Sequence, residues 1–190
     1  RHRINIKTTY HKVLNVTYGT RMLDILPNFM ENELNVIVYN FIDMLSHART
    51  DSDLVRELAA DENAYRGVTK TWFEHSPLLE VLKYLSDKDV DVFITTDHGS
   101  VKVNHPVKIK SNKEASVNLR YKIGRLLEFN DKEVFDVKRP EEISLPSLSM
   151  MSPMIFARAN DFFVYPTNYN YYVSYYMSTF QHGGISMEEC

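Results

Sequence analysis

Two runs of apolar and β-branched residues have the length and composition of buried strands. Leu34 to Ile42 reads LNVIVYNFI, and Val90 to Thr96 reads VDVFITT. Nearly continuous apolar runs of this length are typical of strands that are covered on both faces of a sheet. The pattern therefore predicts two buried strands, each followed directly by polar residues.

Between these runs the spacing of apolar residues becomes helical. Asp51 to Glu57 has a capped helical start, and Ala64 to Leu85 carries large apolar side chains three or four residues apart. Pro77 either splits this stretch into two helices or occupies the first turn of a helix behind Ser76. A strand, a helical crossover and a second strand predict a right-handed βαβ unit with parallel strands.

Downstream of the second run the extended pieces are shorter. We predict them at Val101–Val103, Val134–Val137 and Met154–Ala157, as a sheet edge or a subsidiary hairpin layer, with an irregular loop from Arg139 to Pro153. The tail from Phe162 to Phe180 is rich in tyrosine and contains a helix-length stretch whose large residues must pack on two sides. The whole pattern predicts one α/β domain.

Composition narrows the class of protein. The 190 residues are 44% hydrophobic, which is enough for the core of one domain. No apolar run approaches the roughly 18 residues that a membrane-spanning helix needs. Cys190 is the one cysteine, so an internal disulfide and a CxxC site are both excluded. We expect a cytoplasmic protein that does not associate with membranes.

The charge is unevenly distributed. Gly99 to Leu126 contains seven basic residues and one acidic residue, a local charge of +6 that leaves −9 for the rest at a net charge of −3. The total argues against a general nucleic-acid coat protein, because binding to a phosphate backbone needs positive charge. The basic stretch could still receive an anion locally.

Two Asp-His pairs follow the two predicted strands. Asp43 and His47, in FIDMLSH, are four residues apart and would project from one face of a helical turn, as two ligands of one metal do. Asp97 and His98, in ITTDHGS, follow the second strand. Each pair alone is more often an ordinary surface pair or a turn cap. Together they would lie at one edge of the sheet, where open α/β folds bind ligands.

A third candidate is His182 in QHGGIS, where two glycines permit close backbone approach. Asp43, His47 and His182 would make the one-carboxylate, two-imidazole set of a catalytic zinc site. Arg120, Lys122 and Arg125, in NLRYKIGR, are candidates for binding phosphate, with a solvated basic face as the alternative.

FIDMLSH, ITTDHGS and FQHGGISMEE, in this order, resemble the metal motifs of the alkaline phosphatase superfamily. FFVYPTNYNYY and NLRYKIGR are similar to PglZ domains, closest to those of PorX-type response regulators, which are linked to type IX secretion. The resemblance implies a central, mostly parallel sheet flanked by helices. It also implies two divalent ions, zinc or alternatively manganese, one held by Asp43, His47 and His182 and the other by Asp97 and His98.

The activity that this resemblance implies is hydrolysis of phosphoric esters, as a phosphodiesterase or phosphatase acting on nucleotide-type substrates. The superfamily also expects an early aspartate and a threonine or serine nucleophile, and nothing from Arg1 to Glu33 matches them. We therefore expect residues 1–190 to be a carboxyl-terminal portion of a PglZ domain. The nucleophile and a receiver domain phosphorylated by a histidine kinase would lie upstream, and the isolated portion would be inactive.

Two other functions remain open on the sequence. The first is a signalling module whose zinc site is structural and whose output is partner binding or homodimerisation. The second is a phosphomutase, which would need a sugar-phosphate or glycerate pocket that the sequence does not reveal. The tyrosines from Tyr165 to Tyr176 could stack a nucleobase, although core and interface packing is the commoner role of such residues.

Overall fold

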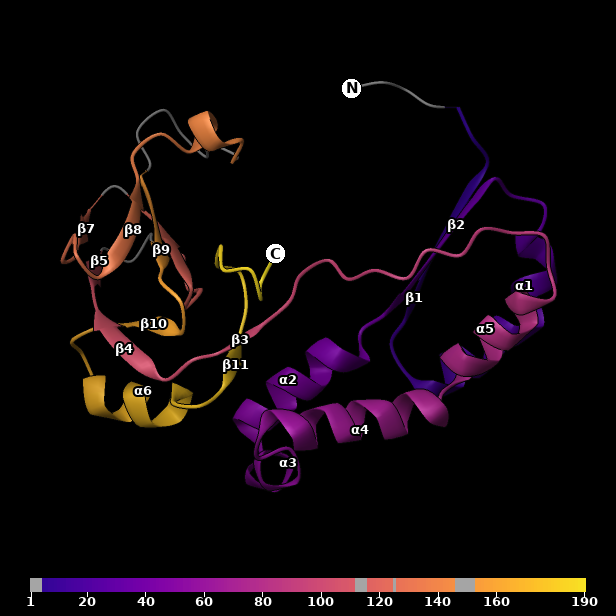
Figure 1. Cartoon of the computed structure of the whole chain (residues 1–190), viewed down its shortest axis with the longest axis horizontal. Helices are drawn as coiled ribbons and strands as arrows, with labels where there is room; N and C mark the ends of the chain where they lie inside the picture. Colours follow the sequence, from indigo (N-terminus) through magenta and orange to yellow (C-terminus); the bar gives the residue numbers. More distant parts are fainter. Residues whose placement is uncertain (1–4, 112–115, 125, 146–152) are drawn as a thin grey trace. The chain divides into compact units, whose positions relative to one another are not determined.

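The computed structural model of the chain describes residues 5–111, 116–124, 126–145 and 153–190. The chain folds as two compact units, Arg1–Ile94 and Thr95–Cys190. The first is drawn in indigo to magenta and the second from salmon to yellow (Figure 1).

The first unit is built on a βαβ motif. Strand β1 (Thr8–Val13), helix α1 (Val16–Phe29) and strand β2 (Leu34–Tyr39) follow one another, and the two strands pair in parallel. The helix begins where it does because the side chain of Asn15 accepts a hydrogen bond from the Tyr18 N–H at 2.8 Å. The sequence analysis predicted β2 within the run from Leu34 to Ile42 but made no prediction for β1 or α1.

In the described part of the first unit, four further helices follow β2. They are α2 (Phe41–Asp51), α3 (Asp53–Leu58), α4 (Glu62–Glu74) and α5 (Pro77–Ser86). Ser52 caps α3 through its side chain, and Pro77 opens α5 directly behind Ser76. The predicted helical stretch is therefore confirmed, and it is divided at Pro77. Helices α1 and α5 lie side by side (Figure 1), and Met22 and Leu26 pack against Val81 in the core between them.

Of the two buried strands that the sequence predicts, the first forms in part and the second does not form. The run from Leu34 to Ile42 is a strand only as far as Tyr39, because α2 already begins at Phe41. It is also not covered on both faces: Leu34 is 47% exposed, since within the described ranges β2 pairs with β1 in a sheet of two strands. Val90 to Thr96 forms no strand, and Phe93 is 89% exposed. A strand needs a hydrogen-bonding partner as well as suitable side chains.

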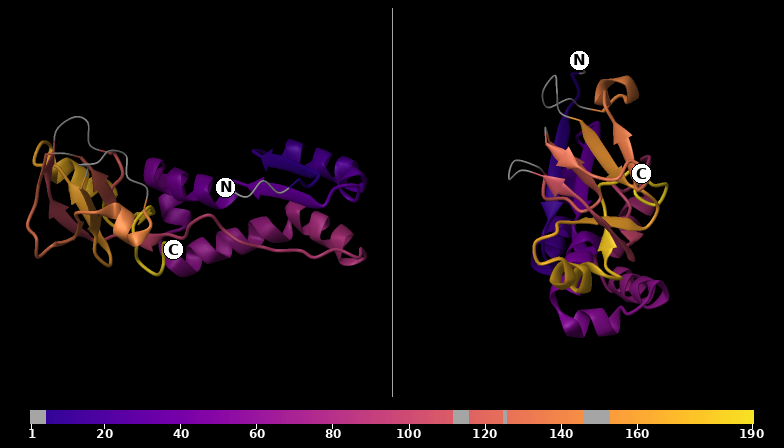
Figure 2. Two further views of the ribbon diagram at one scale, coloured as in Figure 1. Left: turned by 90° about the horizontal axis from the view of Figure 1, so that it is seen from above. Right: turned by 90° about the vertical axis from the view of Figure 1, so that its left-hand side faces the viewer.

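In its described part the second unit consists of short strands, the 3₁₀ turn η1 and helix α6 (Figures 1 and 2). The elements are β3 (Val101–Lys102), β4 (His105–Lys108), β5 (Lys110–Ser111), β6 (Tyr121–Ile123), β7 (Leu127–Glu128), β8 (Val134–Val137), η1 (Pro140–Ile143), β9 (Met154–Ala157), β10 (Asp161–Val164), α6 (Tyr169–Tyr176) and β11 (Phe180–Gln181). The predicted strands β8 and β9 are confirmed with their ends, and β3 is one residue shorter than predicted.

These strands make several small sheets. Strands β6, β9 and β8 form an antiparallel sheet of three strands, and β4 pairs with β10 in parallel. The core beneath them contains Val107, Ile155 and Phe163, while α6 packs through Val173 on a neighbouring cluster around Phe162. The tyrosine-rich stretch is helical, as predicted.

The architecture is thus mixed α/β, as the sequence predicts, but the described residues do not assemble an extensive parallel central sheet. Parallel pairing is found between β1 and β2 and between β4 and β10. Within the loop predicted from Arg139 to Pro153, the described part contains η1. Residues 146–152 lie outside the described ranges. No helix within those ranges is long and apolar enough to cross a lipid bilayer.

Candidate metal centre

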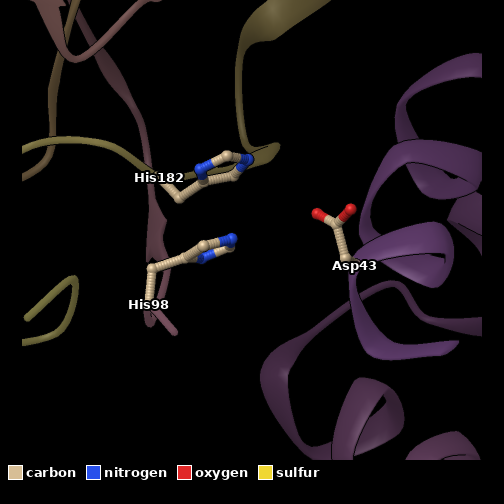
Figure 3. Close-up of side chains that lie close together, drawn as sticks. All are labelled: Asp43, His98 and His182. Atoms are coloured by element: carbon tan, nitrogen blue, oxygen red, sulfur yellow. The ribbon is translucent and has the colours of Figure 1, made fainter. Parts of the chain in front are cut away.

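His98 and His182 are brought together by a pair of short strands. Strand β3 starts at Val101 and β11 ends at Gln181, and these two residues are partners in the antiparallel ladder. His98 lies just before β3 and His182 follows β11 directly, so both histidines emerge at the same end of the pair. Their imidazole rings lie face to face, with centroids 4.0 Å apart and planes 12° apart (Figure 3).

The backbone next to His98 selects one tautomer of its ring. The Nδ1 atom lies 3.0 Å from the carbonyl oxygen of Gly99, so Nδ1–H donates to that oxygen. The lone pair is then on Nε2, which is the arrangement that metal-binding histidines adopt when their other nitrogen is hydrogen-bonded. The ring is part-buried, with its side chain 31% exposed. His98 is therefore held with one nitrogen ready to act as a ligand.

The turn after His182 depends on a glycine. Gly183 has a φ angle of +96°, which side chains other than hydrogen disfavour, and a Cβ there would meet Asn118 Nδ2 at 2.7 Å. The same Asn118 Nδ2 donates a hydrogen bond to the carbonyl oxygen of His182 at 3.1 Å. This explains why a glycine follows His182: the amide of Asn118 has to approach the backbone closely.

Asp97 is adjacent in the chain to His98 but is much more open to solvent. Its side chain is 91% exposed, and its Oδ1 lies 3.8 Å from His98 Nε2. The carboxylate is thus on the ligand side of the ring, opposite the hydrogen-bonded Nδ1. In the second unit the structure thus brings His98 and His182 together, and Asp97 lies beside His98.

Asp43 and His47 belong to the first unit and lie on α2 (Figure 3 labels Asp43). As predicted, both project from one face of this helix, with His47 Nε2 3.4 Å from Asp43 Oδ1. Both side chains are accessible, at 66% for His47 and 39% for Asp43. The sharing of a metal between Asp43, His47 and His182 stays a prediction.

The basic candidates are more buried than the sequence suggests. Arg120 is fully buried, and its guanidinium binds the carboxylate of Glu189 at 2.8 Å. Lys122 is 1% exposed and its Nζ donates to the carbonyl oxygen of Ser116 at 2.8 Å. Arg125 lies outside the described residues. Binding of phosphate by these three side chains stays a prediction.

Sequence reasoning missed the role of Glu189 in this part of the fold. Its side chain is fully buried against Arg120, and its backbone oxygen accepts a hydrogen bond from the Gly99 N–H at 3.0 Å. A glutamate in the polar ending SMEEC carries no local sign of burial. Its partner is 69 positions away in the sequence.

The donor set fits a divalent metal of the zinc or manganese type. Imidazole nitrogen and carboxylate oxygen are common ligands of both ions, and the tautomer of His98 leaves Nε2 unprotonated. The open carboxylate of Asp97 beside a part-buried imidazole also leaves room for water or a substrate oxygen.

Comparison with protein families supports the same chemistry. The model of the BREX system PglZ alkaline phosphatase-like domain matches residues 3–190, which is nearly the whole chain. A comparison with curated proteins gives no match. Alkaline phosphatase-like proteins generally use divalent metals, which agrees with the donors around His98 and points to phosphoesterase chemistry. The chain belongs to the PglZ family of alkaline phosphatase-like domains.

Proposed function

We propose that the protein is a metal-dependent hydrolase of phosphoric esters, a phosphodiesterase or phosphatase that acts on nucleotide-type substrates. The observation that carries the proposal is the pair of stacked imidazoles, His98 and His182, at the common end of β3 and β11. Membership of the PglZ family makes a phosphoric ester the natural substrate for such a pair.

We propose two divalent ions, zinc before manganese, with Asp43, His47 and His182 on one and Asp97 and His98 on the other. Such ions, when bound, neutralise phosphoryl oxygens and lower the pKa of a coordinated hydroxyl. Support for this division comes from the family motifs and from the placement of each Asp-His pair, since Asp43 and His47 share one helix face and Asp97 lies beside His98 Nε2.

The residues of the second unit have distinct parts in this proposal. The Gly99 carbonyl accepts the Nδ1 proton of His98 and keeps Nε2 directed away from the backbone. Asn118 fixes the carbonyl of His182 and so the direction in which that ring leaves β11. Asp97 remains accessible, so it can respond to a ligand by a change of side-chain rotamer.

The test uses the full-length natural protein and a nitrophenyl phosphodiester. We expect hydrolysis that depends on added zinc or manganese and is lost in Asp97→Ala and His98→Ala. His75→Ala is the matched control, because His75 ends α4 and its Nδ1 contacts the Thr71 carbonyl oxygen. Full turnover in both site variants would reject the proposal. Reaction with monoesters alone would restrict it to a phosphatase.

A second candidate function is an interaction module in which the metal has a structural role. The observation in its favour is the exposed tyrosine face of α6, where Tyr171 is 64% exposed and stacks on Tyr175 at 6.0 Å. Aromatic side chains on a surface are typical of protein interfaces. A protein that binds metal, hydrolyses no phosphoric ester, and loses self-association in Tyr171→Ala would support this function against the hydrolase.

The cellular setting is also a proposal. We propose a cytoplasmic response regulator of the PorX type, with a histidine kinase acting on an upstream receiver domain and an output linked to type IX secretion. The support is the resemblance of the aromatic tail and of NLRYKIGR. The amino acids encoded upstream decide it: a receiver domain and a strand ending in aspartate would support the setting, and their absence would remove it.

A further inference from the structure

Arg120 and Glu189 form a buried, two-point ion pair in the second unit. Arg120 Nε binds Glu189 Oε1 and Arg120 Nη2 binds Glu189 Oε2, both at 2.8 Å, and both side chains have no exposed surface. Removing two charges from water is costly, so a buried pair needs further hydrogen bonds and is weak evidence for stability alone. The position of this pair suggests another role.

Glu189 is connected to the neighbourhood of both histidines. Its Oε1 accepts a hydrogen bond from the N–H of Gly184, two residues after His182, at 2.9 Å. Its backbone oxygen accepts from the N–H of Gly99, the residue after His98, at 3.0 Å. One residue thus fixes the backbone beside each imidazole.

The two glycines are required for this approach. A Cβ on Gly99 would meet the Glu188 carbonyl oxygen at 1.9 Å, and one on Gly184 would meet Glu189 Oε2 at 2.3 Å. Both distances are far below van der Waals contact. The backbone at Gly99 and at Gly184 therefore lies directly against residues Glu188 and Glu189. The segments that carry His98 and His182 are therefore packed on Glu189 without intervening side chains.

Arg120 anchors this assembly to the sheet. Its Nη2 donates to the Ala159 carbonyl oxygen at 2.7 Å, and its Nη1 donates to the Asp161 carbonyl oxygen. Its backbone N–H donates to Asn118 Oδ1 at 2.7 Å, and Asn118 in turn holds the carbonyl of His182. The guanidinium of Arg120 thus joins the β9–β10 turn to Glu189, and the Glu189 carboxylate neutralises its positive charge.

The charge state of Glu189 agrees with this arrangement. Burial by itself would raise the pKa of this carboxyl group. The hydrogen bonds and the charge of Arg120, together with hydrogen bonds from Gly184 and Ser186, outweigh burial and leave the pKa below its usual value. Glu189 therefore stays an acceptor for all of these donors at neutral pH.

We propose that Arg120 and Glu189 are positioning residues, which hold the imidazoles of His98 and His182 in their stacked geometry and so set the metal affinity of the centre. Neither residue contacts metal or substrate in this role. The inference rests on the proposed function, because it takes the two histidines to be metal ligands. It gives Arg120 a task different from binding phosphate.

The experiment measures metal binding on the full-length protein. Zinc affinity is obtained by competition with a chromophoric chelator, and the ligand geometry is read from the visible absorption bands of the cobalt(II) form. We expect Glu189→Gln and Arg120→Met each to weaken zinc binding about 10- to 100-fold, the usual effect of losing an outer hydrogen-bonding partner, and to shift the cobalt bands. Arg158→Met is the control, since Arg158 also donates to backbone carbonyls, those of Lys132 and Val134. It should leave both measurements unchanged.

A double variant separates positioning from folding. Arg120→Met with Glu189→Met removes both charges together, so it avoids an unpaired buried ion and should be more stable than either single variant. It still lacks the acceptors for Gly184 and Ser186, so zinc affinity should stay low. A folded double variant with wild-type affinity and cobalt bands would overturn the inference, as would single variants that bind like the wild type. A wild-type protein that binds neither ion would instead overturn the proposed function.

Discussion

Lys122 should make the stability of the second unit increase with pH in the alkaline range. Its side chain is 1% exposed, its Nζ donates to the Ser116 carbonyl oxygen, and Nζ lies 4.9 Å from the centre of the Tyr165 ring. In the described part of the chain no carboxylate forms an ion pair with it. Burial lowers the pKa of Lys122 to about 8 from the ordinary 10.5.

The sign of the effect follows from proton binding. Below pH 8 the lysine is charged in both states, and the folded state carries the full cost of burying the ammonium. Between pH 8 and 10.5 the folded form loses its proton while the unfolded form keeps it, so stability increases with pH. The shift corresponds to about 3 kcal/mol in all, of which about 1.5 kcal/mol should accumulate between pH 8 and 9.5.

The perturbation is Lys122→Met, which is neutral at every pH. At pH 7 it removes the burial cost but also a hydrogen bond worth about 1 kcal/mol and a cation–π contact worth about 0.5–1 kcal/mol, so it should stabilise the unit there by about 1 kcal/mol. The rise in the free energy of unfolding between pH 8 and 9.5, measured by urea denaturation with far-ultraviolet circular dichroism, should be smaller than in the wild type by about 1.5 kcal/mol. Lys132→Met, at an exposed position in the same unit, is the control. If Lys122→Met keeps the full wild-type rise, the reasoning from burial is refuted.

Three other predictions concern local geometry. Gly99→Ala should lower the stability of the second unit by about 1–3 kcal/mol, because its Cβ would meet the Glu188 carbonyl oxygen at 1.9 Å. Gly67→Ala, on α4 with nothing within 4 Å of the new Cβ, should raise the stability of the first unit by about 0.5–1 kcal/mol. For either variant, a urea midpoint equal to that of the wild type would contradict the expectation. Asn15→Ala should cost about 1 kcal/mol, because the Tyr18 N–H loses its cap, and an unchanged unfolding midpoint by Trp72 fluorescence would show that the cap contributes nothing.

The parts of the fold that the sequence predicts correctly depend on local signals. Ser52 and the Ser76–Pro77 pair mark helix starts through contacts within a few residues, and α3 and α5 begin there. The strands β8 and β9 are short apolar runs bounded by polar residues, and their ends are where the sequence predicts them. In these segments the side chains nearby in the sequence decide the structure.

The incorrect predictions concern long-range pairing. Residues Thr8 to Val13 read TTYHKV, a partly polar alternation without a strong strand signal, yet they form β1 because Leu34 to Tyr39 pairs with them in parallel. Val90 to Thr96 has the better strand composition and forms none. Composition shows that a segment is suited to a sheet, but which edge accepts it depends on the rest of the fold.

The candidate centre divides in the same way. Asp43 with His47, and Asp97 with His98, can be found from the sequence because each pair is close along the chain. The stacking of His98 on His182 requires the β3–β11 ladder, which joins segments far apart in the sequence. Neither strand exceeds two residues, so periodicity could not predict their pairing.

The local charge of +6 also needs reinterpretation, because a charge count does not separate the surface from the interior. Two of the seven basic residues between Gly99 and Leu126 are fully buried: Arg120 is neutralised by Glu189, and Lys122 lies beneath Tyr165. The charge of Arg120 is cancelled by Glu189, and neither buried side chain is accessible for direct contact with a phosphate. Lys108 and Lys110, in the same basic stretch, are exposed. Any contact of a phosphoric ester with the described surface of this unit should therefore depend on its exposed lysines rather than on Arg120 and Lys122.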